Sequence, residues 1–154
     1  MKRSPRAALA LALALLPALP LGGCVNDDVH LYEVTLRGEI QVPRGGPYSG
    51  HVHLELRHAR SGEGGLAYPL RRITTIELDG VGPFEETFLV PTDEGEGLVA
   101  YAWLDRDGDG LLCAPGTSDE LAGLREVDGF PAHALEVTIL LEHPCAGAEI
   151  LYAP

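Results

Sequence analysis

The sequence predicts an all-β protein, an antiparallel β-sandwich of six to seven strands. First, apolar residues recur at every second position along much of residues 31–154, which is the period of a half-buried strand. Second, segments rich in Gly, Pro and Asp interrupt these runs at intervals of about 8–12 residues, a spacing typical of sandwiches. Third, no segment after residue 30 shows a long apolar stripe at helical spacing. The 154 residues suffice for one domain with its own core.

Two strands are predicted before residue 60. The first has an apolar face that consists of Tyr32, Val34, Leu36, Ile40 and Val42. A turn rich in Gly and Pro follows over residues 43–50. The second has an apolar face of Val52, Leu54 and Leu56 and an outward face of His51, His53, Glu55 and Arg57. Both runs therefore fit strands that cover one side of a core.

Later strands are predicted over residues 71–79, 84–90, 98–104 and 135–141, with a short edge strand at 150–152. The segment 98–104 is largely apolar at both parities, which indicates a central strand covered on both faces. At most one short helix is expected, near 117–125. There Thr117 or Ser118 would cap the first turn, and Leu121 and Leu124 would share one side.

The order of these pieces resembles the transthyretin-like and carboxypeptidase-regulatory-like sandwiches. In those families a Phe-bearing strand often leads through a turn to an apolar strand that ends in an acidic loop. The matching pieces here are Gly82-Pro83-Phe84, the turn 91–97 and the segment 98–105. The resemblance covers about half of residues 24–154 and implies the same sandwich fold.

The first 21 residues have the layout of an export signal. Lys2, Arg3 and Arg6 precede an apolar run of 15 residues, 7–21. At about 1.5 Å per helical residue this run is roughly 22 Å long, shorter than the ~30 Å hydrocarbon core of a membrane. We therefore expect a signal segment and not a permanent membrane span.

The segment Leu21-Gly22-Gly23-Cys24 resembles the lipobox of bacterial lipoproteins. The resemblance implies a signal peptide over 1–23, cleavage before Cys24 and acylation of that cysteine, whose several acyl chains would hold the chain firmly on a membrane. Residues 24–30 would then be the lipidated N-terminus and a tether, and residues 31–154 the sandwich. Val25 stands where retained inner-membrane lipoproteins often carry Asp, which favours the outer membrane if the host has one. The alternatives are an ordinary secretory signal and a short uncleaved anchor.

The charge of residues 24–154 is strongly negative. This part of the chain holds eight Arg, no Lys and all 23 acidic residues. Such a surface repels phosphate backbones and anionic headgroups. The balance argues against nucleic-acid binding and against docking on membranes through basic residues.

Two cysteines remain if Cys24 is lipidated, as the lipobox resemblance implies. In an exported protein, Cys113 and Cys145 are more economically explained as a disulfide than as two free thiols. The loop-entropy model gives such a bridge roughly 3 kcal/mol of stabilisation. Neither residue lies in a recognisable nucleophile motif.

The motif with the most specific chemistry is the segment 105–111, which resembles the first half of EF-hand and dockerin-type calcium loops. The resemblance implies carboxylate ligands from Asp105, Asp107 and Asp109 and a carbonyl ligand from Leu111. Hard oxygen ligands favour Ca²⁺ over transition metals.

The calcium motif is incomplete. Gly116 occupies the twelfth loop position, where an EF-hand has its bidentate Glu, so the missing carboxylate would come from Asp119 or Glu120. We expect a weak structural site with a Kd of roughly 10⁻⁴ M or somewhat tighter. The alternative is a solvated acidic turn, because Asp and Gly favour turns in any context.

These features favour a non-enzymatic module of the bacterial cell envelope, anchored by lipid, that binds another envelope protein or a polysaccharide. One alternative is a carrier of Zn²⁺ or Cu²⁺ that uses His51 and His53, which lie two apart on one strand face. Another is a hydrolase with a metal in the acidic loop, which would need an open metal position. No Ser-His-Asp order, phosphate-binding loop or helical metal motif is present in the sequence.

Overall fold

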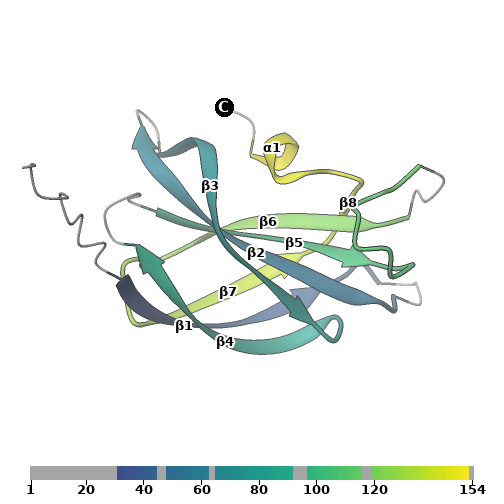
Figure 1. The fold of residues 1–154 in the computed structure, drawn as a ribbon, viewed down its shortest axis with the longest axis horizontal. Coiled ribbons are helices and arrows are strands. Elements are labelled where there is room, and N and C mark those ends of the chain that lie inside the picture. Colours follow the sequence, from purple (N-terminus) through teal and green to yellow (C-terminus); the bar gives the residue numbers. More distant parts are fainter. Residues whose placement is uncertain (1–30, 45–47, 63–64, 92–96, 116–118, 153–154) are drawn as a thin grey trace, which may run out of the picture.

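The computed structural model describes residues 31–44, 48–62, 65–91, 97–115 and 119–152 (Figure 1). The predicted signal peptide (1–23), Cys24, the tether (24–30) and most of the acidic turn 91–97 lie outside these residues. The described residues form two β-sheets that pack face to face, so the predicted all-β sandwich is confirmed.

The smaller sheet has three strands in the order β4-β1-β7. Their bounds are Leu31–Gln41 for β1, Gly82–Pro91 for β4 and Ala134–Leu140 for β7. β1 lies in the centre, antiparallel to β4 and parallel to β7. The parallel pair departs from the purely antiparallel arrangement that we expected. It is possible because β7 follows β6 of the other sheet, so no hairpin sets its direction relative to β1.

The larger sheet has five strands in the order β3-β2-β5-β6-β8, and all neighbouring strands are antiparallel. Their bounds are His51–Gly62 for β2, Gly65–Leu78 for β3, Gly97–Asp105 for β5, Leu121–Val127 for β6 and His143–Pro144 for β8. The described residues thus form eight strands where six to seven were predicted. The two residues of β8 are too few to show any alternation.

The main core lies between the two sheets. Its buried residues from β1, β2, β4 and β7 are Val34, Leu36, Ile40, Val52, Leu54, Leu56, Phe88, Val90, Leu135, Val137 and Ile139. All of them belong to the predicted apolar faces. All nine residues of β5 are buried, which confirms the prediction of a central strand covered on both sides.

The second cover of β5 comes from the C-terminal region. A short helix, α1 (Ala148–Leu151), lies over the side of the larger sheet that faces away from the smaller sheet (Figure 1). Ala148 packs there with Tyr101 and Trp103 of β5 and with Ala122 of β6. The molecule therefore has a second, smaller apolar cluster outside the sandwich.

Two predictions of local structure were wrong. The expected helix near 117–125 is instead occupied by strand β6 in its described part, and the expected strand at 150–152 falls on α1 and the residue after it. β6 is a strand because it pairs with β5, and because Gly123 lets the backbone of β7 approach. A Cβ at Gly123 would lie 2.2 Å from the carbonyl oxygen of Leu140. Tertiary pairing has overridden the apparent helical spacing of Leu121 and Leu124.

The ends of β2, β5 and β6 meet at one end of the sandwich. His51 pairs with Asp105, and Ala122 pairs with Trp103. Gly50, just before β2, has a φ of +143°, and a Cβ there would lie 2.0 Å from the Asp105 carbonyl oxygen. Only glycine allows this close approach. The loop that leaves β5 is thereby held against the start of β2.

Candidate functional site

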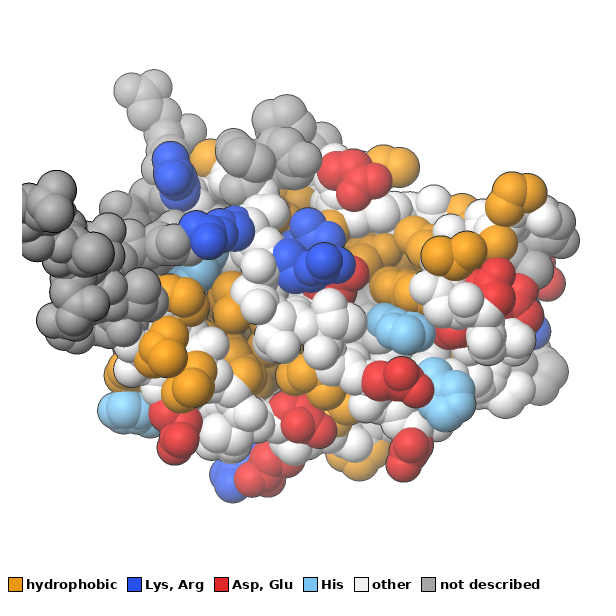
Figure 2. All heavy atoms as spheres, in the orientation of Figure 1, with side chains coloured by type: hydrophobic (Ala, Val, Ile, Leu, Met, Phe, Trp, Pro, Cys, Tyr) orange, Lys and Arg blue, Asp and Glu red, His pale blue; other side chains and the backbone are white. Residues whose placement is uncertain are grey.

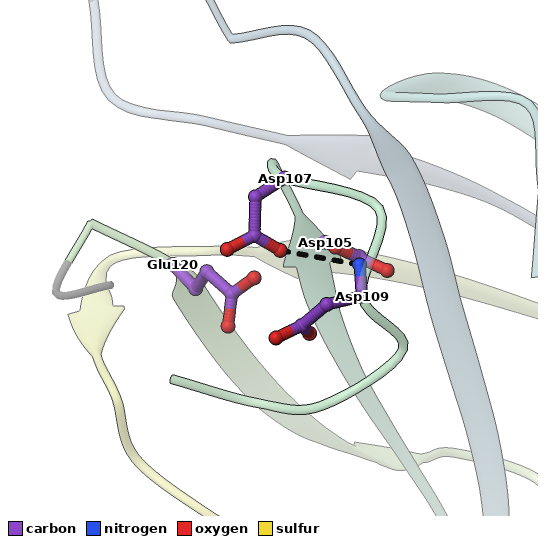
Figure 3. Close-up of side chains that lie close together, drawn as sticks. All are labelled: Asp105, Asp107, Asp109 and Glu120. Atoms are coloured by element: carbon purple, nitrogen blue, oxygen red, sulfur yellow. Dashed lines mark hydrogen bonds between the residues drawn. The ribbon is translucent and has the colours of Figure 1, made fainter. Parts of the chain in front are cut away.

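The connection from β5 to β6 brings the acidic residues of the sequence together. Asp105 is the last residue of β5, and Glu120 immediately precedes β6. Because β5 and β6 are neighbouring antiparallel strands, the end of β5 lies beside the start of β6, and the two side chains are close together at this end of the sheet. The loop between β5 and β6 places Asp107 and Asp109 beside Asp105 and Glu120 at the same end of the sheet (Figure 3).

Carboxylates from all four residues converge. One carboxylate oxygen from each of Asp105, Asp107, Asp109 and Glu120 lies within 4.8 Å of the others (Figure 3). Asp105 is 3% exposed and Glu120 is 1% exposed, whereas Asp107 and Asp109 are exposed. We call these four residues the carboxylate cluster. It has a buried floor and an open side.

Backbone N–H groups of the loop bind the Asp105 carboxylate. Asp105 Oδ1 accepts a hydrogen bond from the Gly108 N–H at 2.7 Å, and Oδ2 accepts one from the Gly110 N–H at 2.9 Å. Both glycines have a positive φ, +78° and +73°, which non-glycine residues rarely adopt. The Asp–Gly repeat of the sequence is therefore what closes this loop.

The other two aspartates make tight local turns. Asp107 Oδ1 accepts the Asp109 N–H at 3.2 Å, and Asp109 Oδ1 accepts the Leu111 N–H at 2.7 Å. These bonds fix where the two exposed carboxylates stand. The Leu111 side chain is 60% exposed, and its carbonyl remains a predicted ligand.

Glu120 connects the cluster to the disulfide. Cys113 and Cys145 form the disulfide that the sequence predicted. The Glu120 carboxylate accepts hydrogen bonds from the N–H groups of Cys113 and Arg106, and its backbone carbonyl accepts the Cys145 N–H at 2.9 Å. One buried residue thus holds both halves of the bridge and faces the acidic loop.

Of the two residues offered for the missing carboxylate, Glu120 and not Asp119 lies in the cluster. The Asp119 side chain is 79% exposed, and its carboxylate pairs with the Arg106 guanidinium at 3.3 Å. Neighbouring residues that enter a strand point to opposite faces, so only one of the two can face the loop.

Asp105 is held in its charged form. Burial acts to raise its pKa, but the hydrogen bonds from Gly110 and Gly108, with His53 nearby, outweigh that effect, and the pKa lies below its ordinary value. A second carboxylate, Glu120, is buried beside it. Anionic oxygens in this number and spacing form a ligand set for a hard divalent cation such as Ca²⁺ or Mg²⁺.

The two candidate histidines have separate partners. The His51 Nδ1 lies 3.5 Å from Glu77. The His53 ring stacks on Trp103, with ring centroids 4.3 Å apart, and its Nε2 lies 3.5 Å from Asp105 Oδ2. Among the described residues, the carboxylate cluster is the one group of three or more potential metal-binding side chains, and it includes neither histidine.

Sequence reasoning missed the support that β2 gives to the site. His53 is opposite Trp103 in the β2–β5 register, and the stacked pair lies beside Asp105. The sequence places Gly50 in a turn but does not show that a side chain at this position would collide with the end of β5. These relations depend on the strand register, which a single sequence does not reveal.

No helix in the described part of the chain is long and apolar enough to cross a membrane. No family model, curated protein or solved structure matches the chain.

Proposed function

We propose that this protein is a lipid-anchored, non-enzymatic binding or assembly module of the bacterial cell envelope, and that its acidic loop takes a structural Ca²⁺ ion. The observation that carries the calcium part is the convergence of Asp105, Asp107, Asp109 and Glu120 within 4.8 Å. The anchor part rests on the lipobox-like segment Leu21-Gly22-Gly23-Cys24.

Charge balance favours a cation in the loop. Two of the four carboxylates are buried, and buried charges are costly unless they are paired or bind a metal. Arg106, the cation next to Asp105 in the chain, directs its guanidinium to Asp119 and not to the cluster. Two of the ligand residues, Asp107 and Asp109, are exposed and lie in the loop that an ion would have to hold in place. These features fit a weak site with a Kd of roughly 10⁻⁴ M.

A structural role fits the site better than a catalytic one. A catalytic metal needs an open coordination position next to a substrate pocket. Here the aspartates are needed as ligands, and Asp105 and Glu120 also accept the backbone N–H groups that shape the loop. The ion would hold the acidic loop against the ends of β5 and β6, and the disulfide joins the same loop, through Cys113, to the C-terminal region at Cys145.

The surface fits a macromolecular partner. On the face shown in Figure 2 several basic side chains gather towards the upper left and centre, and acidic side chains lie mainly to the right and below. Residues 24–154 hold eight Arg and 23 acidic residues, and this negative balance favours an envelope protein or a polysaccharide over a nucleic acid, which requires a positive field.

Thermal unfolding of the full chain in detergent, in EDTA and then in Ca²⁺, Mg²⁺ or Zn²⁺, tests the ion. At a concentration of 100 Kd, Ca²⁺ should stabilise the fold by about 2.7 kcal/mol, a shift of several degrees in Tm. Asp107→Asn should weaken this response, because it removes a ligand charge and keeps the oxygen that accepts the Asp109 N–H.

Asp128→Asn is the matched control, since it removes the same charge from an exposed residue after the far end of β6. An unchanged Tm in Ca²⁺, or an equal loss of response in both variants, would contradict the calcium site. Stabilisation by Zn²⁺ alone, lost when His51 and His53 are both changed to Ala, would instead support the metal carrier.

The anchor is tested by metabolic labelling with radioactive palmitate in a bacterial host. The full chain should incorporate the label and sediment with membranes, because Cys24 would be acylated. Cys24→Ala should lose the label. A chain that is exported but unlabelled would overturn the lipid anchor and leave an ordinary secretory signal.

A further inference from the structure

The C-terminal residues 145–152, which we call the strap, cross the outer side of the five-stranded sheet (Figure 1). The strap contributes one residue, Ala148, to a buried cluster with Tyr101, Trp103 and Ala122. Leu112 of the acidic loop and Leu151 of the strap pack against this cluster. Trp103 is the single tryptophan of the chain and is only 6% exposed.

The disulfide joins the two segments that cover this aromatic face. Cys113 directly follows Leu112, and Cys145 precedes Ala148 by three residues. Without the bridge, the strap is held by its apolar contacts and by a few hydrogen bonds to β5, β6 and the residue before β6. Tyr101 Oη donates to the Ala146 carbonyl at 3.0 Å, and the Cys145 N–H donates to the Glu120 carbonyl. Tyr152, at the end of the strap, donates its hydroxyl to the Glu126 carboxylate at 2.6 Å and packs against the cluster of Ala59, Leu70 and Val99, so opening of the strap also breaks these contacts.

The strap has little structure of its own. Its helix α1 is four residues long, far below the length at which an isolated helix is stable in water. Just before the strap, β8 pairs with β6 through only two residue pairs. The main core between the sheets contains no strap residue. Loss of the strap would therefore uncover the outer face while the sandwich stays folded.

We propose that the Cys113–Cys145 disulfide is a redox latch that keeps the strap over Tyr101 and Trp103. Cys145 is exposed, so a thiolate of a partner dithiol can attack its sulfur. The Cys113 sulfur leaves with the electron pair and takes up a proton. The second thiol of the partner then resolves the mixed disulfide. Cys145 ends as a thiol, the partner ends as a disulfide, and the protein has gained two electrons and two protons.

The consequence is a change of surface. Release of residues 145–152 and of Leu112 exposes Tyr101 and Trp103, two aromatic side chains on a central strand. The oxidised protein hides this face, and the reduced protein presents it. This proposal does not depend on calcium, because the strap covers the aromatic cluster through apolar contacts and the disulfide.

The test follows Trp103 fluorescence and far-UV circular dichroism of the full chain in detergent with EDTA, before and after reduction by a phosphine. Reduction should shift the emission to the red and raise acrylamide quenching several-fold, with the β-sheet signal retained. The double variant Cys113→Ser and Cys145→Ser should show the open state without reductant and no further response to it.

A second variant guards against a double mutant that fails to fold. Ala148→Glu places a charge under the strap while both cysteines remain, so it should lower the reductant concentration needed for opening. Unchanged quenching after complete reduction, checked by thiol titration, would overturn the latch. Loss of the β-sheet signal together with the change in quenching would also overturn it, because the disulfide would then hold the whole domain.

Discussion

The two sheets of this sandwich have very different outer faces. On the three-stranded sheet the outer face meets solvent, and even its apolar residue Leu89 is 52% exposed. On the five-stranded sheet the outer residues of β5, which are Val99, Tyr101 and Trp103, are 0%, 3% and 6% exposed. β5 is apolar on both faces because one face packs on the smaller sheet and the other is covered by the strap, by Leu112 of the acidic loop and by Ala59 and Leu70 of its own sheet. The described residues form no third sheet that could provide this cover.

Polar groups on the two faces are satisfied in different ways. On the open face, residues pair across strands in water, as Thr35 does with Thr87 at 3.0 Å and Arg37 with Glu85 at 2.9 Å. On the covered face, Arg57 lies over the Tyr101 ring and bonds Glu55, which is 9% exposed. Burial, and then the Glu55 and Glu149 charges, raise the pKa of Tyr101. On the covered face, polar side chains such as Glu55 are therefore satisfied by other side chains of the protein and not by water.

The largest expected difference between the faces comes from a new charge. Val99→Asp should destabilise the domain by more than about 4 kcal/mol, because Val99 is buried against Ala59 and Leu70, and because Arg57, its neighbour across the strand pair, already bonds Glu55. Leu89→Asp makes the same kind of change on the open face, where the new carboxylate stays in water and is repelled only by Glu33 on the neighbouring strand, and should stay within about 1 kcal/mol. Equilibrium unfolding in urea measures both. Equal losses would show that the two faces are equally buried in solution.

A smaller difference is expected for the loss of one hydroxyl group. Tyr101→Phe leaves the Ala146 carbonyl, in a residue 7% exposed, without its donor and should cost about 1 kcal/mol. Thr87→Val removes a hydroxyl that bonds Thr35 on the open face. There water replaces the lost partner, so we expect no measurable change in the urea midpoint. A Tyr101→Phe variant as stable as the parent would mean that the strap does not hold this bond.

The smallest expected effect concerns the Arg37–Glu85 pair. The hydrogen bond from Arg37, and then its charge, lower the pKa of Glu85 from the ordinary value of 4.5. A depressed carboxylate pKa adds stability above the ordinary value, and this stability is lost as the pH falls through the pKa of the folded state. Arg37→Gln should therefore have a slightly lower Tm than the parent at neutral pH and in low salt.

That Tm difference should shrink as the pH falls through the lowered pKa of Glu85 in the folded state, and it should also shrink in high salt because both groups are exposed. Gln41→Ala on the same strand is a control that removes no charge. A difference that persists in acid would mean that Arg37 acts through packing and not through its charge.

The same contrast explains which sequence predictions succeeded. Strict alternation in β1, β4 and β7 revealed their two faces, because one face meets the core and the other meets water. The sequence predicts a helix over part of β6 because Leu121 and Leu124 are three residues apart, and because the exposed Arg125 and Glu126 interrupt the apolar positions on both faces of the strand. β5 is buried on both faces, but its continuous apolar run identifies it as a strand, and β6 has no such run.

The sequence alone determined the sandwich class, the central position of β5 and the acidic loop, because each follows from local order in the chain. The pairing of Cys113 with Cys145 followed from the sequence only together with the lipobox resemblance, which removes Cys24 from the three cysteines. Only the tertiary structure decided that Glu120 and not Asp119 joins Asp105, that His53 stacks beside it, and that the strap covers Trp103. These contacts depend on strand register and on which face a residue takes as it enters a sheet, and long-range pairing fixes both.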